Sequence, residues 1–494
     1  MLKIIDPNWN KSVISITILL SILLSIFVLV DPEFSSSILS QTYGILSVTF
    51  EDFYMYGSFF LLIFLISLAL SRYGTIKLKL QNKPTYTMLS WSSMLFAAGI
   101  GATLLYWSTI EWIEYYNILK NDTELTSEEL LLYSRSYPIF HWGFTAWAIY
   151  CLPVVAFGLA LTLKPNSNLT FSGILSVQNT ILKFILDVLF IGAIICGAGV
   201  GLGLSFPLIS SVLSKIFMIE RTFSLDIFTI LICSVIFATS AYIGVQNGIK
   251  RLSNLNMILV IIFLIVVFLL GPTSYIFSNS IKTLGFLSSN YIDMSLTTGT
   301  EISLDWSVFY WAWWYALAPM VGTFLVNISN NRTLREVIFG SILIGTLGCV
   351  LSMTILSNLS IHLFESGAIN APDILENKIY SREDLVVNSI MSLNFGYILL
   401  IGFALIIIIF LCTTYDSASY VLASASMKDS TISGSKSLRL VFAFLLVVQP
   451  TLLMYLNGVD SFKWIMVIFS VPLLFINCLL IYSILKNVYR IKKS

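Results

Sequence analysis

Long stretches without a charged residue alternate with short polar segments along most of the chain. Several of these stretches exceed one straight crossing of a bilayer, which predicts tilted or broken helices. Twelve windows lack Asp, Glu, Lys and Arg and are each long enough for a helix of about 20 residues to span a membrane: 12–30, 53–71, 84–110, 136–163, 188–214, 227–249, 252–281, 306–331, 337–364, 385–415, 440–459 and 464–485. The pattern predicts an all-α membrane protein with twelve transmembrane helices.

The composition agrees with this prediction. Of 494 residues, 57% are hydrophobic and 11% charged, and the mean hydropathy is +0.89, values that no soluble domain of this size has. The 27 basic residues nearly balance the 26 acidic ones, so nucleic acid is not an expected partner. Six cysteines, all in apolar windows, and two widely separated histidines favour free thiols over disulfides or a metal site. No nucleophile–base pair or cofactor motif is present, so we expect neither an enzyme nor a cofactor.

The distribution of Lys and Arg predicts the orientation. If the sides alternate along twelve spans, 19 of the 27 basic residues lie on the side of the two termini. By the positive-inside rule, both termini are expected in the cytoplasm, in a cytoplasmic membrane of the bacterial type. The first window lacks a cleavage site of small residues and is expected to remain as a span. On the outer side, segments 271–304 and 365–384 are expected to hold short interfacial helices.

Aromatic residues are concentrated in the eighth window. The seven residues Phe309–Tyr315 carry six aromatic rings inside a charge-free window. Aromatic rings of membrane helices normally lie at the water interface, whereas a dense cluster within a span is suited to a cation without hydrogen-bond donors, such as a quaternary ammonium. In the fourth window, Trp142, Trp147 and Tyr150 share one side of a straight helix at about 100° per residue. An interfacial belt is the alternative interpretation of these three rings.

Small and hydroxyl residues mark places where helices can open or pack closely. Segment 97–102 reads Ala-Ala-Gly-Ile-Gly-Ala, which favours either an unwound stretch that faces a solute or close helix packing. In the glycine-rich segment 197–203, packing is the stronger interpretation. Thr413 and Thr414, with loosened backbone carbonyls, would offer hard oxygen ligands to a small alkali cation; alternatively, their hydroxyls bond back to their own helix. We expect Asp416 to act as a lock at a helix terminus.

Together these motifs resemble the betaine/choline/carnitine transporter (BCCT) family. The matching segments are 94–101, 140–143, 147–150, 252–257, 306–322, 327–336 and 413–417. The resemblance implies a secondary transporter with two leading helices and a core of two inverted five-helix repeats of the LeuT type. The implied divisions are 1–83 for the leading helices, 84–281 and 305–485 for the repeats, 282–304 for an outer connecting segment and 486–494 for a short cytoplasmic tail.

The resemblance also implies positions for the bound solutes. The trimethylammonium group would lie in an aromatic box, with Gly99, Ile100 and Gly101 facing the other end of the substrate. By motif, the box comprises Trp142, Trp147, Tyr150 and Trp314, with Trp311 and Trp313 nearby in the gating path. In sodium-coupled members, the ion site would map to the backbone carbonyls of Ala97, Ile100 and Phe410 and the hydroxyls of Thr413 and Thr414.

Departures from the family pattern refine the expected activity. Met257 stands where sodium-independent exchangers have an arginine, which favours sodium coupling. Ile194 and Ala198 replace the hydroxyl residues of a second sodium site, so one sodium ion is expected. Choline carriers have an acidic residue around the position of Thr103. This chain has none there, which favours a zwitterionic substrate over a bare cation. We therefore expect sodium-coupled import of glycine betaine or carnitine by alternating access. The alternatives are a sodium-independent carnitine or betaine exchanger, a choline transporter, and a receptor that binds without transport. Homotrimers are usual in the family.

Overall fold

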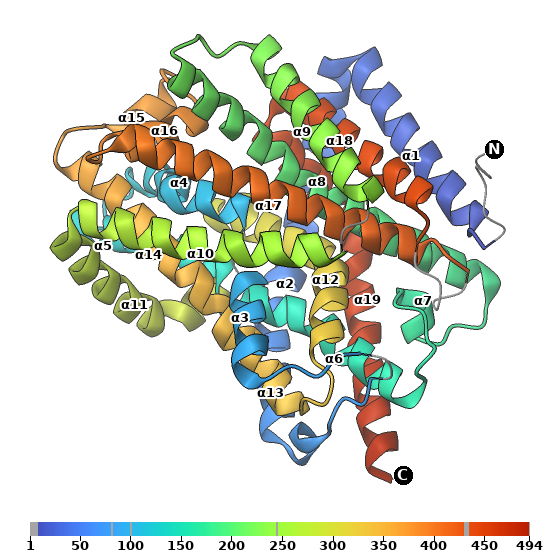
Figure 1. Ribbon diagram of the computed structural model, residues 1–494. Helices are drawn as coiled ribbons and strands as arrows, with labels where there is room; N and C mark the ends of the chain where they lie inside the picture. The colour runs from blue at the N-terminus through green and yellow to red at the C-terminus, as the bar shows by residue number, and fades with distance from the viewer. Residues whose placement is uncertain (1–7, 81–82, 99–100, 244–245, 429–433, 494) are drawn as a thin grey trace.

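The computed structural model describes residues 8–80, 83–98, 101–243, 246–428 and 434–493, and these are helical almost throughout (Figure 1). The helices of the first half of the chain are α1 (Lys11–Val30), α2 (Pro32–Leu70), the short η1 (Arg72–Thr75), α3 (Met88–Ala98), α4 (Ala102–Leu119), α5 (Ser127–Trp142), α6 (Phe144–Leu163), α7 (Phe171–Ile174), α8 (Thr180–Phe217), α9 (Phe223–Ile243) and α10 (Gln246–Leu270). Those of the second half are α11 (Thr273–Leu296), η2 (Ser303–Ser307), α12 (Val308–Ile328), α13 (Leu334–Phe339), η3 (Gly340–Ile344), α14 (Gly345–Glu365), α15 (Ala371–Glu376), α16 (Arg382–Met391), α17 (Gly396–Ala425), α18 (Lys436–Asn457) and α19 (Val459–Lys493).

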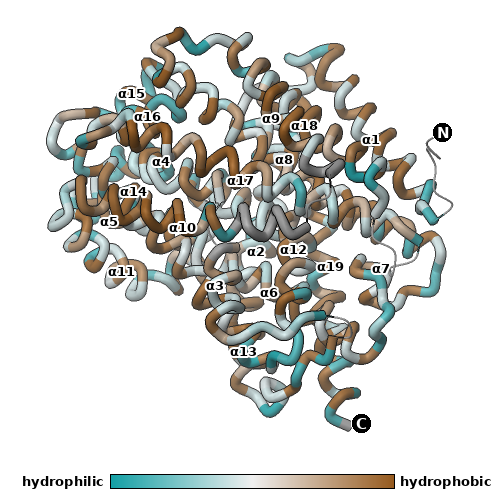
Figure 2. Tube along the Cα trace, viewed as in Figure 1, coloured by the Kyte–Doolittle hydropathy of each residue, from teal (hydrophilic) through white to brown (hydrophobic). Residues whose placement is uncertain are grey.

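The prediction of an all-α membrane protein is confirmed. Within the described ranges, eight helical segments are long and apolar enough to cross a membrane, and the bent pair α10–α11 makes a ninth. The remaining three charge-free windows, 84–110, 227–249 and 306–331, overlap described helices that do not meet this criterion. The first is divided between α3 and α4, and the last is rich in Trp and Tyr, whose hydropathy is low. Apolar residues extend along the outward-facing helices, whereas polar residues gather in the connecting segments (Figure 2).

Several spans differ from their predicted limits. The tenth window, 385–415, begins within α16, whereas α17 runs from Gly396 to Ala425. α2 begins at Pro32, well before the charge-free window at 53–71, because Glu51 and Asp52 are accommodated inside a helix of 39 residues. The seventh window, 252–281, extends beyond the end of its helix. α10 ends at Leu270, and α11 begins at Thr273 with its axis at 110° to that of α10. The predicted boundary between 281 and 282 therefore falls inside α11. Helices in both long outer segments are present as predicted, although α11 has 24 residues and is not short.

Helix packing is reciprocal between the two halves of the core. α6 of the first predicted repeat packs against α12 of the second. The helices at the corresponding positions of the opposite repeats, α14 and α4, also pack against each other. In the same way, contacts of α8 with α18 correspond to contacts of α9 with α17, while α8 and α17 contact each other. In Figure 1, α10 and α17 run side by side across the front. Such pairing is what a pseudo-two-fold relation between inverted repeats produces. The division points between the repeats stay a prediction.

Contacts between connecting segments respect the predicted alternation of sides. On the side of the termini, the backbones of Lys77 and Thr333 form an isolated antiparallel β-bridge. The Asn10 amide donates to the carbonyl of Ser426 at 2.8 Å. On the opposite side, Lys120 pairs with Glu376, joining the end of α4 to α15. Segments assigned to one side thus contact one another, whereas the identity of the cytoplasmic side stays a prediction.

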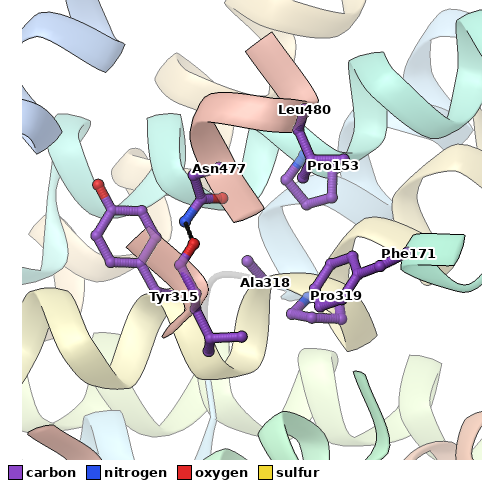
Figure 3. Close-up of a pocket in the computed structure, with 8 residues that line it drawn as sticks. Pro153, Phe171, Tyr315, Ala318, Pro319, Asn477 and Leu480 are labelled. Carbon is purple, nitrogen blue, oxygen red and sulfur yellow. Dashed lines mark hydrogen bonds between the residues drawn. The ribbon is translucent and has the colours of Figure 1, made fainter. Parts of the chain in front are cut away.

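The crossing of α6 and α12 is a close contact between proline and glycine. A Cβ atom on Gly322 would lie 2.7 Å from Cγ of Pro153, so only glycine permits this approach. Figure 3 shows Pro153, Pro319 and Tyr315 around a residual cavity of about 10 Å³, roughly the smallest space that holds one water molecule. This tight crossing fixes α12 against α6, and these two helices carry most of the candidate site.

Candidate functional site

Four aromatic rings from three helices meet in one buried cluster: Trp142, Tyr150, Trp313 and Trp314. From here on, this cluster is called the aromatic box; it differs from the predicted box in having Trp313 in place of Trp147. Trp313 and Trp314 stack with centroids 4.9 Å apart and planes 14° apart. Trp142 stands edge-on to Trp314 at 4.7 Å, and Tyr150 does so at 5.7 Å. Each side chain is at most 8% exposed. The predicted rings of the fourth and eighth windows are therefore neighbours in the structure.

Of the other two predicted tryptophans, Trp147 lies at the edge of the aromatic box and Trp311 lies outside it. Trp147 is next to Tyr150, with centroids 5.5 Å apart, and its indole lies against Gly345. Trp311 is on a different side of α12 and contacts Phe140 and His141, at 5.5 and 5.6 Å. It forms no ring pair with the aromatic box among the contacts of the described residues.

A helix break at Gly143 places the rings of the fourth window. Its backbone, at φ −91° and ψ −137°, separates α5, which ends at Trp142, from α6, which carries Trp147 and Tyr150. A Cβ atom there would lie 2.5 Å from the carbonyl oxygen of Ile139. The helix is therefore interrupted between Trp142 and the other two rings, so the angle of 100° per residue that was assumed for a straight helix does not apply across Gly143. They gather because α12 packs against α6 and Trp314 bridges Trp142 and Tyr150.

Each tryptophan of the aromatic box uses its indole N–H on another part of the protein. Trp314 donates to the carbonyl of His141 at 2.8 Å, and Trp313 donates to the carbonyl of Gly197 at 2.9 Å. Trp142 donates to Glu111 at 2.9 Å. These bonds fix the ring planes, and they leave no indole donor for a ligand.

A buried polar network lies behind Trp142. Glu111 is fully buried and also accepts a hydrogen bond of 2.6 Å from the hydroxyl of Tyr115. Tyr115 is 2.7 Å from Nδ1 of His141, whose Nε2 is 2.8 Å from the hydroxyl of Ser307. Since Tyr115 donates to Glu111, it accepts from Nδ1–H, and Nε2 accepts from Ser307. This assignment leaves the imidazole neutral and both oxygens of Glu111 occupied by donors.

Glu111, Tyr115 and Ser307 were not among the predicted site residues. A signal was available for Glu111, because it directly follows the third charge-free window, at a position where α4 continues to Leu119. A charged group at such a position is a functional candidate by default. Its partners were not accessible from sequence spacing, since His141 and Ser307 lie on other helical elements.

Ion pairs and hydrogen bonds join α4 to several other elements. Arg382 of α16 contacts Glu114 at 2.7 Å, and this carboxylate raises the pKa of the guanidinium above its usual value. Glu383 accepts hydrogen bonds from Arg221, at 3.0 Å, and from Tyr106, at 3.2 Å. The segment that begins α16 is thereby held against α4 and the connection between α8 and α9.

The helix break predicted in the third window is partly visible. α3 ends at Ala98 and α4 begins at Ala102, with Gly101 in an extended conformation at φ −144° and ψ 172°. Gly99 and Ile100 lie outside the described residues, and so does the side chain of Ala97. In the fifth span the packing interpretation is confirmed: α8 is continuous through 197–203, and its glycines contact α12, α18 and α19.

Three residues of the predicted sodium site, Phe410, Thr413 and Thr414, lie on α17, which is continuous through them, whereas Ala97 belongs to α3 and Ile100 lies outside the described residues. The hydroxyl of Thr413 bonds to the carbonyls of Ile409 and Phe410 at 3.1 and 3.0 Å, the alternative given above. Thr414 is partly buried and follows it on the same helix. The carbonyls here are not loosened by a helix end, and the sodium assignment stays a prediction. Asp416 is not at a helix terminus, because α17 extends to Ala425.

A multi-helix membrane protein with a buried aromatic box beside a helix break has the architecture of a secondary transporter. Residues 12–493 match the family model described as "BCCT, betaine/carnitine/choline family transporter", and the chain belongs to this family. It is 30% identical to a carnitine transporter of Acinetobacter baumannii, over 87% of this chain and 80% of that protein. It is 28% identical to a glycine betaine transporter of Bacillus subtilis, over 94% and 92%, and 26% identical to a high-affinity choline transport protein of Escherichia coli, over 95% and 70%. The chain is thus a transporter and not an enzyme.

Proposed function

We propose that this transporter imports a zwitterionic trimethylammonium compound, such as glycine betaine or carnitine, by alternating access with sodium as the coupling ion. The observation that carries the proposal is the chemistry of the aromatic box. Its three indole N–H groups are bonded to protein oxygens, so the ligand meets π faces and no indole donor. A methylated ammonium group has no N–H to donate and is attracted to such faces.

The aromatic box needs no free carboxylate for this attraction. Glu111, the acid nearest to Trp142 in the hydrogen-bond network, is occupied by two donors. Cation–π attraction is worth about 0.5–2 kcal/mol per well-placed ring. Three or four rings therefore account for binding in the millimolar to micromolar range.

The other end of a zwitterion fits the beginning of α4. Gly101 precedes this helix, and the hydroxyl of Thr103 in its first turn lies 3.4 Å from the carbonyl of Gly201. A Cβ atom on Gly201 would lie 3.9 Å from the ring of Trp313, so the start of α4 is next to the aromatic box. The free N–H groups of a helix N-terminus favour a carboxylate. Choline has no such group, which is why we favour a betaine.

One observation favours a second candidate, a sodium-independent exchanger. Thr413 uses its hydroxyl within its own helix, and α17 is unbroken at the residues that would hold sodium. Uptake of radiolabelled glycine betaine, carnitine and choline into proteoliposomes, with and without a sodium gradient, tests both candidates. Import of a betaine that requires the gradient supports the proposal. Counterflow from preloaded liposomes without sodium would support the exchanger, and saturable binding without any uptake would refute transport of these compounds.

A further inference from the structure

A second cavity, of about 280 Å³, lies far from the aromatic box, where α6, α7 and α19 come together near the C-terminal end of the chain. Figure 1 shows α7 beside the lower half of α19. The lining residues are Ala160, Leu163, Lys164, Ser167, Ile174, Leu175, Ser176, Tyr482, Ser483, Lys486, Asn487 and Arg490. This volume is near the lower end of typical ligand pockets, about 300 Å³.

The cavity carries three positive charges on its wall. These are Lys164, at the end of α6, and Lys486 and Arg490, which are four residues apart on α19. Among the described residues that line it, none is Asp or Glu. Like charges repel one another, so this wall favours an anion between them.

Neutral hydrogen-bonding groups complete the polar part of the cavity. Ser483 and Asn487 are each only 8% exposed, and the Asn487 amide lies 3.4 Å from the Ser483 hydroxyl. On the opposite wall, the Ser176 hydroxyl lies 3.4 Å from Nζ of Lys164. Hydroxyl, amide, ammonium and guanidinium groups together match the oxygens of a phosphate.

The surroundings of the cavity are suited to hydrocarbon chains. Along α19, Leu479, Tyr482, Leu485 and Tyr489 are between 44% and 64% exposed, on a helix apolar enough to span the membrane. Tyrosine on such a helix is typical of the level of the lipid headgroups. A charged cavity at this level, beside an apolar helix face, is accessible to a lipid from the bilayer.

We propose that this cavity binds the phosphate-bearing headgroup of an anionic phospholipid, with its acyl chains along α19. The cavity lies on the side assigned to the cytoplasm by the positive-inside rule. Clusters of Lys and Arg between membrane helices on that side are suited to such headgroups, and each charge strengthens binding by about fivefold. Three charges together then account for roughly a hundredfold preference over a lipid without net charge.

Native mass spectrometry of the full-length protein, freed of bound lipid in detergent, tests the proposal with phosphatidylglycerol and phosphatidylcholine as probes. We expect selective retention of phosphatidylglycerol, and a loss of roughly a hundredfold in its affinity when Lys164→Gln, Lys486→Gln and Arg490→Gln are combined. The matched control combines Arg72→Gln, Lys77→Gln and Lys79→Gln, which removes three exposed charges on the same side but outside the cavity.

Equal weakening by both triple variants would overturn the proposal, because lipid binding would then reflect only the overall charge of that side. Inorganic phosphate that binds while phosphatidylglycerol does not would identify a soluble phosphate as the ligand and would also refute it. If the cavity variant does not fold, photoactivatable phosphatidylglycerol on the unmodified protein provides an independent measurement. Labelling is expected within 160–176 and 479–490, and labelling confined to other segments would contradict the assignment.

Discussion

Replacement of Trp314 by leucine removes the ring at the centre of the aromatic box. Trp314 lies within 6 Å of three other rings of the box, with centroid distances of 4.7 Å to Trp142, 4.9 Å to Trp313 and 5.7 Å to Tyr150. It is 2% exposed. Leucine fills part of its volume but offers no π face to a cation.

The expected loss of affinity follows from two terms. One missing cation–π contact is worth about 0.5–2 kcal/mol. The neighbouring rings also lose an edge-to-face or stacked partner, and each such pair contributes about 0.5–1.5 kcal/mol to their orientation. One cation–π contact and one ring pair together amount to about 1–3.5 kcal/mol, which corresponds to a loss in affinity of roughly fivefold to several hundredfold. Uptake from micromolar substrate should therefore fall strongly.

The control must separate affinity from stability. Trp112 is also fully buried and donates its indole N–H, to Ser360 at 3.1 Å, but its ring contacts are Tyr116 and Phe364, outside the aromatic box. Trp112→Leu should thus cost a similar amount of folding free energy, about 3–5 kcal/mol at most. The Trp112→Leu variant should have an unchanged KM, measured on the fraction of the protein that folds.

The assay combines radiolabelled uptake into proteoliposomes, equilibrium binding and the thermal midpoint of the purified protein. Trp314→Phe, which retains a π face but loses the bond to the carbonyl of His141, should give an intermediate affinity. If Trp314→Leu transported with an unchanged KM, or if Trp112→Leu weakened binding equally, the assignment of the aromatic box as the cation site would be refuted.

Two further substitutions test the supports of the aromatic box. Glu111→Gln has one carbonyl oxygen in place of the two oxygens that accept from Tyr115 and Trp142, so one buried donor loses its partner, at a cost of about 1–3 kcal/mol. We expect Trp142 to be less well held and substrate binding to weaken about tenfold; unchanged binding would show that this bond does not position the ring. Gly345→Ala would place a Cβ atom 2.3 Å from the ring of Trp147, so we expect a destabilisation of about 1–3 kcal/mol and reduced uptake, whereas Gly402→Ala, with no atom within 4 Å, should be neutral in the thermal midpoint and in uptake.

The positions of the spans could be predicted because charge is costly in a bilayer and therefore marks where helices end. This logic failed for α2, in which Glu51 finds internal partners, the hydroxyl of Ser303 and the amide of Gly299. A buried acid that is paired within the protein does not end a helix. The charge pattern also failed to predict the end of α10. The chain turns by 110° before α11, but the first residues of α11 after Pro272 are neutral, so the charge-free window continues to 281.

The candidate site was predictable in its residue types but not in its geometry. Rings inside charge-free windows pointed to the aromatic box, and helical angles separate Trp311 from Trp313 by about 200°, in agreement with their different surroundings. The break at Gly143 could not be read in this way, because Phe-His-Trp-Gly continues an apolar helical pattern. Equally, the partners of the indole N–H groups depend on which helices pack together, and a single sequence does not give this.

The aromatic box is built across the division that the resemblance implies between the two repeats. Trp313 and Trp314 belong to α12 in the second, whereas the carbonyls that accept their bonds, at Gly197 and His141, belong to the first. A movement of one repeat against the other must therefore strain or break these bonds and separate the rings of α12 from Trp142. A substrate that needs both walls favours only those states in which they are together. If the aromatic box is the cation site, as proposed, the contacts that fix its rings also link its occupancy to the relative position of the two repeats, which is the condition for alternating access.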